Sequence, residues 1–507
     1  MNQLKAGAAL NYIVIILNML VGLIYTPYML RMMGQSEYGL YSLVASVIAY
    51  LTVLDLGLGN AVIRYTAKFR AEGKTRDQYE MFGMFLILYI IIGLIAFVAG
   101  MGLYYNVDNM FGSTMTPIEL DHARIMMLIL VINLAVTFPM SIFGSIINAY
   151  EHFVFPKVLN IARVILNTVI MIVLLHLGYK AIAMVILQTI FNLTTLLLIY
   201  IYCKQKLKIK IIFGKFNWGF FKEVSIYSFW IFLNVIMDKI YWSTGQFVLG
   251  AVSGTVAISI FAVAIQLQSM YMQFSTAISS VFLPKVTRMV TENNDSGTLS
   301  QLFIRTGRIQ NIVMSFILFA FIPFGRPFVH LWAGSEYNDS YVITLLFFIS
   351  LYIPLIQNLG ITILQARNQM KFRSILYIII ASLSLVFQYL FAIKWGGIGC
   401  AIAIASALFI GQGVIMNIYY WRKQNLNILA FWREILKMDI APIFVTIIYV
   451  LITFNYDITS WTSLFIHALT YSAIYALMFL KFSMNDNERV LLLEPFKRII
   501  KNDKHYR

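Results

Sequence analysis

The sequence predicts an all-α integral membrane protein with about 14 transmembrane helices and both termini in the cytoplasm. Of its 507 residues, 60% are hydrophobic and 12% are charged, and its mean hydropathy is +0.79. Soluble domains average about 45–50% apolar and about 25% charged residues, so this composition cannot cover a water-exposed surface. Apolar runs of membrane-crossing length and basic residues that alternate between connectors complete the argument.

Long apolar runs interrupted by polar clusters predict the individual spans. The run that follows Lys5 is too long for the apolar region of a cleavable signal peptide, so we expect it to be the first span. Pro323 shortens the ninth run, which is the least regular. The fourteen spans are expected near residues 7–30, 39–60, 81–104, 124–148, 155–177, 181–202, 222–249, 256–281, 309–325, 341–364, 373–393, 397–420, 440–455 and 461–480.

The Lys and Arg residues alternate sharply between successive connectors. Of the 38, 32 lie in the N-terminal segment, in every second connector and in the C-terminal tail, and Lys239 lies within a span. Short connectors rich in Lys and Arg remain in the cytoplasm, which predicts an even number of spans. The net charge of +16 therefore orients the chain, and we expect no nucleic-acid partner. The opposite side has Arg31, Arg124, Lys180, Arg326 and Lys394.

Twelve of the spans form a doubled six-helix unit. The segment Tyr200–Leu207 reappears as Tyr419–Leu426, and Gly178 corresponds to Gly396 at nearly the same shift. Six spans per repeat give both copies the same orientation, with a cavity between two lobes that alternates in access. We predict an N-terminal lobe at 1–215, a C-terminal lobe at 216–426, and two additional helices with a basic tail at 427–507. This plan favours a transporter over a channel.

Charged side chains inside spans are candidate transport residues, because a charge at a helix centre costs about 2.5–3.5 kcal/mol on insertion scales. Lys239 lies near the middle of the seventh span as a candidate phosphate ligand, with Asp238 paired elsewhere; a charge pair that only fixes helix packing is the alternative. Asp55 is either a coupling carboxylate or a structural partner of a basic residue. Arg64 and Arg163 either extend to lipid headgroups or bind a pyrophosphate through bidentate guanidinium contacts at the inward mouth.

Uncharged polar residues within spans suit a path for sugars, and hydrogen bonds between helices are the alternative. The sequence has no Walker-type phosphate loop and no histidine–carboxylate cluster with metal-binding spacing. We therefore expect no catalytic residue, no metal and no cofactor. The candidates for the polar path are Asn148, Asn234, Gln266, Gln357 and Gln365.

The 6+6+2 plan resembles the multidrug/oligosaccharidyl-lipid/polysaccharide exporter superfamily. The segment Gly34–Tyr41 resembles the G-x-x-x-Y-G entry to the second span. The segment Asp55–Asn60, followed by Arg64 and Tyr65, resembles the end of that span in polysaccharide repeat-unit flippases. Asp238, followed by a glycine-containing turn, resembles the region of spans 7 and 8.

This resemblance implies a transporter that flips undecaprenyl-pyrophosphate-linked oligosaccharide repeat units from the inner to the outer leaflet of the bacterial cytoplasmic membrane, for cell-surface polysaccharide synthesis. It implies membrane lipids around the polyprenyl tail, H⁺ or Na⁺ as coupling ion, and a polysaccharide polymerase or chain-length machinery as protein partners. The alternative is an ion-coupled multidrug antiporter, expected to have an acidic, aromatic cavity without a central lysine. A membrane transferase or polymerase is disfavoured because no external connector is long enough to hold its catalytic site.

Overall fold

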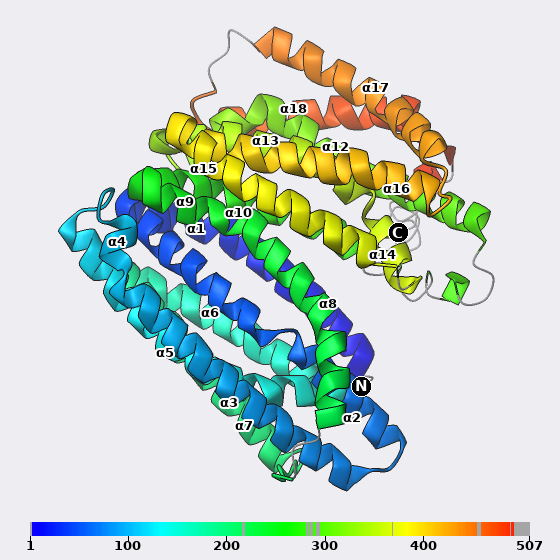
Figure 1. Ribbon diagram of the computed structural model, residues 1–507. Coiled ribbons are helices and arrows are strands. Elements are labelled where there is room, and N and C mark those ends of the chain that lie inside the picture. The colour runs from blue at the N-terminus through cyan, green and yellow to red at the C-terminus, as the bar shows by residue number, and fades with distance from the viewer. Residues whose placement is uncertain are drawn as a thin grey trace, which may run out of the picture. The chain divides into compact units, whose positions relative to one another are not determined.

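The computed structural model describes residues 3–214, 218–279, 282, 286, 288–290, 295–367, 369–453, 458–486 and 488–490. The structure is 90% helix, and its described residues form no strand (Figure 1). Contacts within the chain divide it into two units, residues 1–263 with 377–403 and residues 264–376 with 404–507. The prediction of an all-α membrane protein is confirmed. The predicted lobe boundaries remain predictions.

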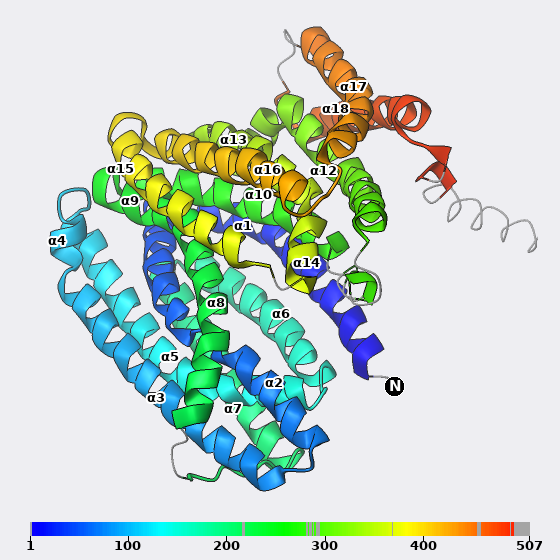
Figure 2. The same ribbon diagram turned by 45° about the vertical axis from the view of Figure 1, so that its right-hand side comes forward.

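The first unit is a bundle in which α3, α5 and α7 lie side by side (Figures 1 and 2). One 3-10 turn, Thr52–Asp55, connects α1 to α2. The helices that begin in the first unit are α1 (Gln3–Leu51), α2 (Leu58–Ala71), α3 (Thr75–Tyr105), α4 (Val107–Phe111), α5 (Pro117–Ala149), α6 (Val154–His176), α7 (Ala181–Gln205), α8 (Trp218–Trp242), α9 (Thr244–Val252) and α10 (Gly254–Ser279).

The second unit is built around a long helix, α12, against which α13, α17 and α18 pack. The predicted thirteenth and fourteenth spans are α17 and α18, whose aromatic side chains form a core with α12. The helices of this part are α12 (Ser296–Trp332), α13 (Asp339–Ile356), α14 (Asn358–Ala366), α15 (Lys371–Leu408, whose middle belongs to the first unit), α16 (Met416–Arg422), α17 (Ile428–Thr453) and α18 (Trp461–Met478).

Eleven helical runs among the described residues are long and apolar enough to cross a membrane. Two of them, Ala9–Ala71 and Lys371–Arg422, are 63 and 52 residues long, more than twice the length that one crossing needs. α8 is not among the eleven. A multi-pass membrane protein is thus confirmed, whereas the total of fourteen spans and the cytoplasmic termini remain predictions.

The first long run reverses its direction at Gly34. This residue has φ 80° and ψ 169°, outside the helical region, a conformation that glycine adopts without steric cost. Before the reversal, the Asn11 side chain accepts a hydrogen bond from Lys157 in the first turn of α6 (2.6 Å). After it, Arg70 donates to the carbonyl of Ala149, the last residue of α5, just before the connector to α6 (3.1 Å). Residues 11 and 70 therefore lie at the same end of the bundle.

The second long run reverses at Gly396, which has φ 54° and ψ −134°. Cys400 Sγ lies 3.7 Å from the carbonyl oxygen of Gln388, across the reversal. Farther from Gly396, near the two ends of the run, the rings of Phe372 and Tyr419 stack with their centroids 4.1 Å apart. The run is therefore a pair of antiparallel helices joined at one glycine.

The glycines that the sequence places at equivalent positions of a repeat both have a positive φ. Gly178, between α6 and α7, and Gly396 have φ values of 89° and 54°. Gly34 and Gly254 also have positive φ values, 80° and 81°. Each of the four lies where one long helix ends and the next begins, so a side chain at any of them would be strained.

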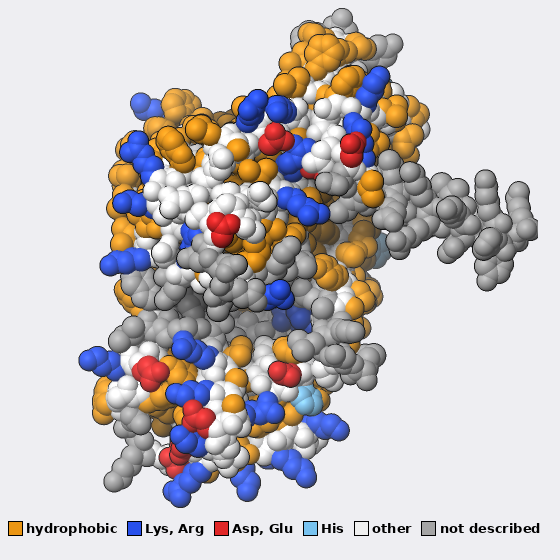
Figure 3. Space-filling view, turned by 90° about the vertical axis from the view of Figure 1, so that its right-hand side faces the viewer, with side chains coloured by type: hydrophobic (Ala, Val, Ile, Leu, Met, Phe, Trp, Pro, Cys, Tyr) orange, Lys and Arg blue, Asp and Glu red, His pale blue; other side chains and the backbone are white. Residues whose placement is uncertain are grey.

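The basic connectors of the first unit meet at one end of its helices. Gln78 donates to the hydroxyl of Tyr150 (2.7 Å), and the Arg70 guanidinium lies 4.2 Å from the centre of the Tyr150 ring. The Ile212 amide donates to the carbonyl of Tyr79 (3.2 Å). These contacts join the end of α2 and the start of α3 to the connectors that follow α5 and α7. Lys and Arg side chains are spread over the face in Figure 3, among few acidic ones.

At the other end, Glu119 ties the start of α5 to two other helices. Thr116 and Glu119 form a capping box, the Thr255 hydroxyl donates to Glu119 Oε1 (2.8 Å), and the Ser36 hydroxyl donates to the same oxygen.

We expect Thr116→Ala to lower the free energy of unfolding by about 1 kcal/mol, because the backbone amide of Glu119 at the start of α5 loses its acceptor. Titration with SDS, followed by circular dichroism, measures this change in the free energy of unfolding. Thr116→Ser should be neutral, and an equal loss in both variants would contradict the cap.

The start of α12 is capped in a comparable way by Asp295, outside the membrane-spanning run. The Thr298 hydroxyl and the backbone amides of Thr298 and Gly297 donate to its carboxylate. These hydrogen bonds hold the pKa of Asp295 below its ordinary value, the Thr298 hydroxyl contributing most. Helix α12 therefore begins well before the predicted ninth span, which was expected from residue 309.

Candidate functional site

Arg163 lies in the middle of α6, as the tenth of its 23 residues. Helix α6 (Val154–His176) coincides within one residue at each end with the span expected near 155–177. Arg163 Nη1 donates to Asn192 Oδ1 on α7 (3.5 Å). Among the described residues, no carboxylate lies within 4 Å of the guanidinium.

The orientation of the Asn192 amide is fixed by two acceptors on α5. Its Nδ2 donates to Asn133 Oδ1 (2.9 Å) and to Thr137 Oγ1 (2.8 Å), while the Thr137 hydroxyl donates to the Asn133 carbonyl (2.7 Å). Both amide hydrogens are thereby used, so the amide oxygen faces Arg163. Most N–H donors of Arg163 are left for another acceptor, because guanidinium has five.

Asp55 ends a 3-10 turn, Thr52–Asp55, that interrupts the helix between α1 and α2. Leu56 and Gly57 follow with left-handed backbone angles, φ 53° and 71°. The turn packs against α8, and the buried Tyr89 hydroxyl lies beside the Asp55 carboxyl. The helix is therefore interrupted directly after Asp55.

Lys239 lies one turn before Ser243, where α8 ends and α9 begins. Its side chain is half-buried, and that of Asp238 is exposed. No described carboxylate lies within 4 Å of the Lys239 ammonium group. Just beyond the break, the Thr244 and Tyr50 hydroxyls are in hydrogen-bond contact. A helix interruption next to a charged side chain is a common feature of transporter binding sites.

The remaining predicted residues of the first unit are less enclosed. Arg64 is exposed, with its guanidinium 5.7 Å from the centre of the Tyr65 ring. Tyr65 in turn donates to Glu223 on α8 (2.8 Å). Asn148 is exposed near the end of α5. The side chain of Asn234 lies outside the described part of the chain.

In the second unit, the predicted polar residues differ in how deeply their side chains are buried. Gln357 is 2% exposed, and its amide exchanges two hydrogen bonds with Asn417 (2.8 and 3.0 Å). Its side chain is thus engaged between helices in this conformation. Gln266 is half-buried, and Gln365 is exposed.

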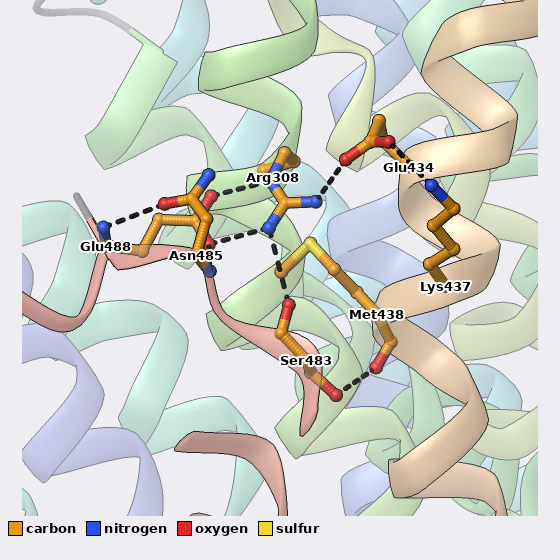
Figure 4. Close-up of polar contacts among 7 residues, drawn as sticks. All are labelled: Arg308, Glu434, Lys437, Met438, Ser483, Asn485 and Glu488. Atoms are coloured by element: carbon orange, nitrogen blue, oxygen red, sulfur yellow. Dashed lines mark hydrogen bonds and ion pairs between the residues drawn. The ribbon is translucent and has the colours of Figure 1, made fainter. Parts of the chain in front are cut away.

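The second unit also contains a buried ion cluster that the sequence did not indicate (Figure 4). The Arg308 side chain, 7% exposed, donates from Nε and Nη2 to the two oxygens of Glu488 (2.6 and 2.8 Å). Its Nη1 donates to Glu434 on α17 (2.8 Å), and Nη2 also donates to the Ser483 carbonyl (3.3 Å). A cavity of about 400 Å³ lies beside this cluster. Arg308 stood at the edge of a predicted basic connector, and its partners are 126 and 180 residues away.

The fold is shared with solved transporters. A lipid II flippase, MurJ, in an inward closed conformation superimposes with a TM-score of 0.69 at 18% identity, over 93% of this chain and 97% of that one. An inward-facing multidrug resistance transporter of the MATE family gives a TM-score of 0.65 at 15% identity, over 82% and 95%. The chain therefore has the fold of the multidrug/oligosaccharidyl-lipid/polysaccharide exporter superfamily.

Sequence comparisons specify the family. The family described as polysaccharide biosynthesis protein matches residues 4–290, more than half of the chain. An uncharacterized membrane protein of Bacillus subtilis strain 168, EpsK, is 20% identical over 501 residues, 96% of this chain and 97% of its own. A putative O-antigen transporter of Salmonella typhimurium LT2 is 29% identical over 69 residues, 14% of this chain and 16% of its own. The chain belongs to the polysaccharide biosynthesis protein family, and the resemblance noted from its motifs is confirmed.

Proposed function

We propose that this protein flips undecaprenyl-pyrophosphate-linked oligosaccharides from the inner to the outer leaflet of the bacterial cytoplasmic membrane by alternating access. Its family supports a role in polysaccharide biosynthesis. Similarity to a protein named as an O-antigen transporter supports a lipid-linked saccharide as the substrate. The fold shared with a lipid II flippase supports a substrate whose polyprenyl tail remains in the bilayer.

The observation that carries the proposal is Arg163 in the middle of a membrane-spanning helix with only a neutral amide as its partner. A cation within the bilayer is costly unless an anion compensates it. A pyrophosphate supplies that anion, and guanidinium binds phosphate oxygens in a bidentate manner. Lys239 supports the same reading, because no described carboxylate neutralises it. Asn192 and Asn133 would then orient Arg163 toward the headgroup.

A multidrug antiporter has the same fold and is the second candidate. An antiporter for cationic drugs needs carboxylates where this chain has Arg163 and Lys239 without acidic partners. Asp55 is the acidic side chain of the first unit that such a mechanism would use, and its turn packs against the helix that bears Lys239. Two basic side chains without a described carboxylate partner, against one carboxyl, favour an anionic substrate over a cationic one.

Arg163→Ala is expected to slow translocation by about tenfold to a hundredfold, because a charge-assisted hydrogen bond is worth about 1.5–3 kcal/mol. The measurement uses proteoliposomes with a fluorescent lipid-linked oligosaccharide and a membrane-impermeant quencher. Arg163→Lys should give an intermediate rate, since ammonium lacks the bidentate geometry. Arg124→Ala is the matched control, because Arg124 pairs with Asp121 at the opposite end of the unit (3.0 Å).

The same liposomes distinguish the two candidates. Export of a cationic dye without movement of the lipid would contradict the flippase and support the antiporter. Unchanged lipid movement in Arg163→Ala would remove Arg163 from the binding site.

A further inference from the structure

Three side chains from three helices of the second unit form a closed ring of polar contacts. Asn311 on α12 donates from Nδ2 to Asp439 Oδ1 on α17 (2.9 Å). The phenol oxygen of Tyr352 on α13 lies 2.6 Å from Asp439 Oδ2 and is also in hydrogen-bond contact with Asn311 Oδ1. Asp439 is 5% exposed and Asn311 is fully buried. Asp439 lies near the middle of α17, inside a membrane-spanning run.

The number of hydrogens in this ring does not close if Asp439 is ionised. Three contacts need three hydrogens, of which the Asn311 amide supplies one and the Tyr352 hydroxyl supplies one. Exchanging the amide nitrogen and oxygen of Asn311 does not remove the shortage. The amide then donates to Tyr352, but its oxygen faces an oxygen of the ionised Asp439, and neither of these two acceptors carries a hydrogen. The third hydrogen must come from Asp439. A protonated carboxyl donates to Tyr352, whose hydroxyl donates to Asn311, and all three groups are satisfied.

No cation compensates a negative charge at this position. Among the described residues, no Lys, Arg or His lies within 4 Å of the Asp439 carboxyl. Arg308 lies one turn before Asn311 on α12, but Glu434 and Glu488 bind it. An ionised carboxylate held only by neutral donors in a buried site is costly, which agrees with the count of hydrogens.

The other titratable groups around the ring are also accounted for. On α18, the Tyr475 hydroxyl is bonded to Ser315 (2.9 Å), and on α10 the Tyr271 hydroxyl donates to the Met314 carbonyl (3.1 Å). On α17, Lys437 lies 3.4 Å from Glu434 and is exposed. None of these groups supplies the missing hydrogen to the ring.

We propose that Asp439, Asn311 and Tyr352 form a proton-binding site and, resting on the proposed function, that the proton bound there is the coupling ion of transport. With the proton bound, the ring closes and joins α17 to α12 and α13. When the proton leaves to water, the carboxylate repels the oxygen of Asn311 or Tyr352 that has lost its donor, and the three helices separate at this point. The site therefore links proton occupancy to the packing of the second unit.

A cavity lies beside two of the helices that carry the ring. The cavity of about 400 Å³ is lined by Arg308 and Ile312 of α12 and by Glu434 of α17. Glu434 precedes Asp439 by five residues, about 7.5 Å along the helix axis at 1.5 Å per residue. Ile312 directly follows Asn311, so the cavity and the ring share two helices.

Infrared difference spectroscopy of the full-length protein in liposomes tests the site directly. At neutral pH we expect the carbonyl stretch of a buried protonated carboxylic acid, which should shift with isotope-labelled aspartate and disappear in Asp439→Asn. This variant should still fold, because an amide N–H replaces the acid O–H. Tyr352→Phe should shift the band, since the acid loses its acceptor. The control Asp121→Asn removes an exposed carboxylate and should leave the band unchanged.

A spectrum of the labelled parent protein without this band at neutral pH would overturn the site, whatever the variants do. Coupling is tested separately by imposing a pH gradient during translocation of the fluorescent lipid-linked oligosaccharide. We expect the gradient to accelerate the parent protein and not Asp439→Asn. Lipid movement that ignores the gradient in the parent would overturn the coupling. A parent that moves no lipid under any gradient contradicts the proposed function, while the infrared result for the site stands.

Discussion

Replacing Arg308 with alanine is expected to lower the free energy of unfolding by about 3–5 kcal/mol, the cost of breaking a buried ion pair from one side. The guanidinium is 7% exposed and the Glu488 side chain 8%. Removing the cation leaves the Glu488 carboxylate buried without its two donors. Glu434 is 36% exposed and contributes less, because water compensates it.

Unfolding by SDS, followed by the loss of helical circular dichroism, measures this effect. The double variant Arg308→Met with Glu488→Gln should recover a large part of the loss, because it removes both buried charges together. Arg305→Ala is the matched control, since Arg305 lines the same cavity but is exposed. A loss in Arg308→Ala no larger than in Arg305→Ala would contradict the buried pair.

Gly39→Ala is expected to destabilise the first unit by about 1–3 kcal/mol or more, the usual cost of overpacking a close contact. A Cβ at Gly39 would lie 1.9 Å from the carbonyl oxygen of Thr255 and 2.7 Å from its carbon. These are backbone atoms of α10, so no side-chain rotation relieves the clash, and the two helices must separate. The same SDS titration measures the loss.

Gly102→Ala provides the control for Gly39→Ala. Gly102 lies within α3, and a Cβ added there would have no neighbouring atom within 4 Å. Alanine there should stabilise the helix by up to about 1 kcal/mol, because alanine has the higher helix propensity. If Gly39→Ala were as stable as Gly102→Ala, the close approach of α1 and α10 would be wrong.

Much of the fold follows from hydropathy and charge along the sequence. Apolar runs predicted the membrane-spanning helices, and Gly178 and Gly396, which the sequence places at equivalent positions, both have a positive φ. Helix ends were predicted less well. The thirteenth span was expected from residue 440, but α17 begins at Ile428, because a helix continues through polar residues that hydropathy assigns to a connector.

The error in the start of the thirteenth span explains why the ring of Asp439, Asn311 and Tyr352 was not predicted. With the span starting at residue 440, Asp439 counted as a connector residue, and Arg308 was assigned to a connector for the same reason. The partners Asn311 and Tyr352 come from helices far apart in sequence, so only packing reveals the ring. Asn192 was missed likewise, because a single amide in an apolar helix gives no sign of which helix it faces. Arg163, by contrast, is a candidate on the basis of its charge alone.

The ion cluster at Arg308 has a consequence for the order of events during synthesis. Glu488 follows Arg308 by 180 residues, which a ribosome needs about 9–36 seconds to add at 5–20 residues per second. Until Glu434, 126 residues after Arg308, has been added, the guanidinium has neither of its carboxylate partners, so the polar start of α12 is expected to stay at the membrane surface. The helices of the second unit are then expected to pack around Arg308 late in synthesis, after α17 and the segment that follows α18 have been added and supply its carboxylate partners.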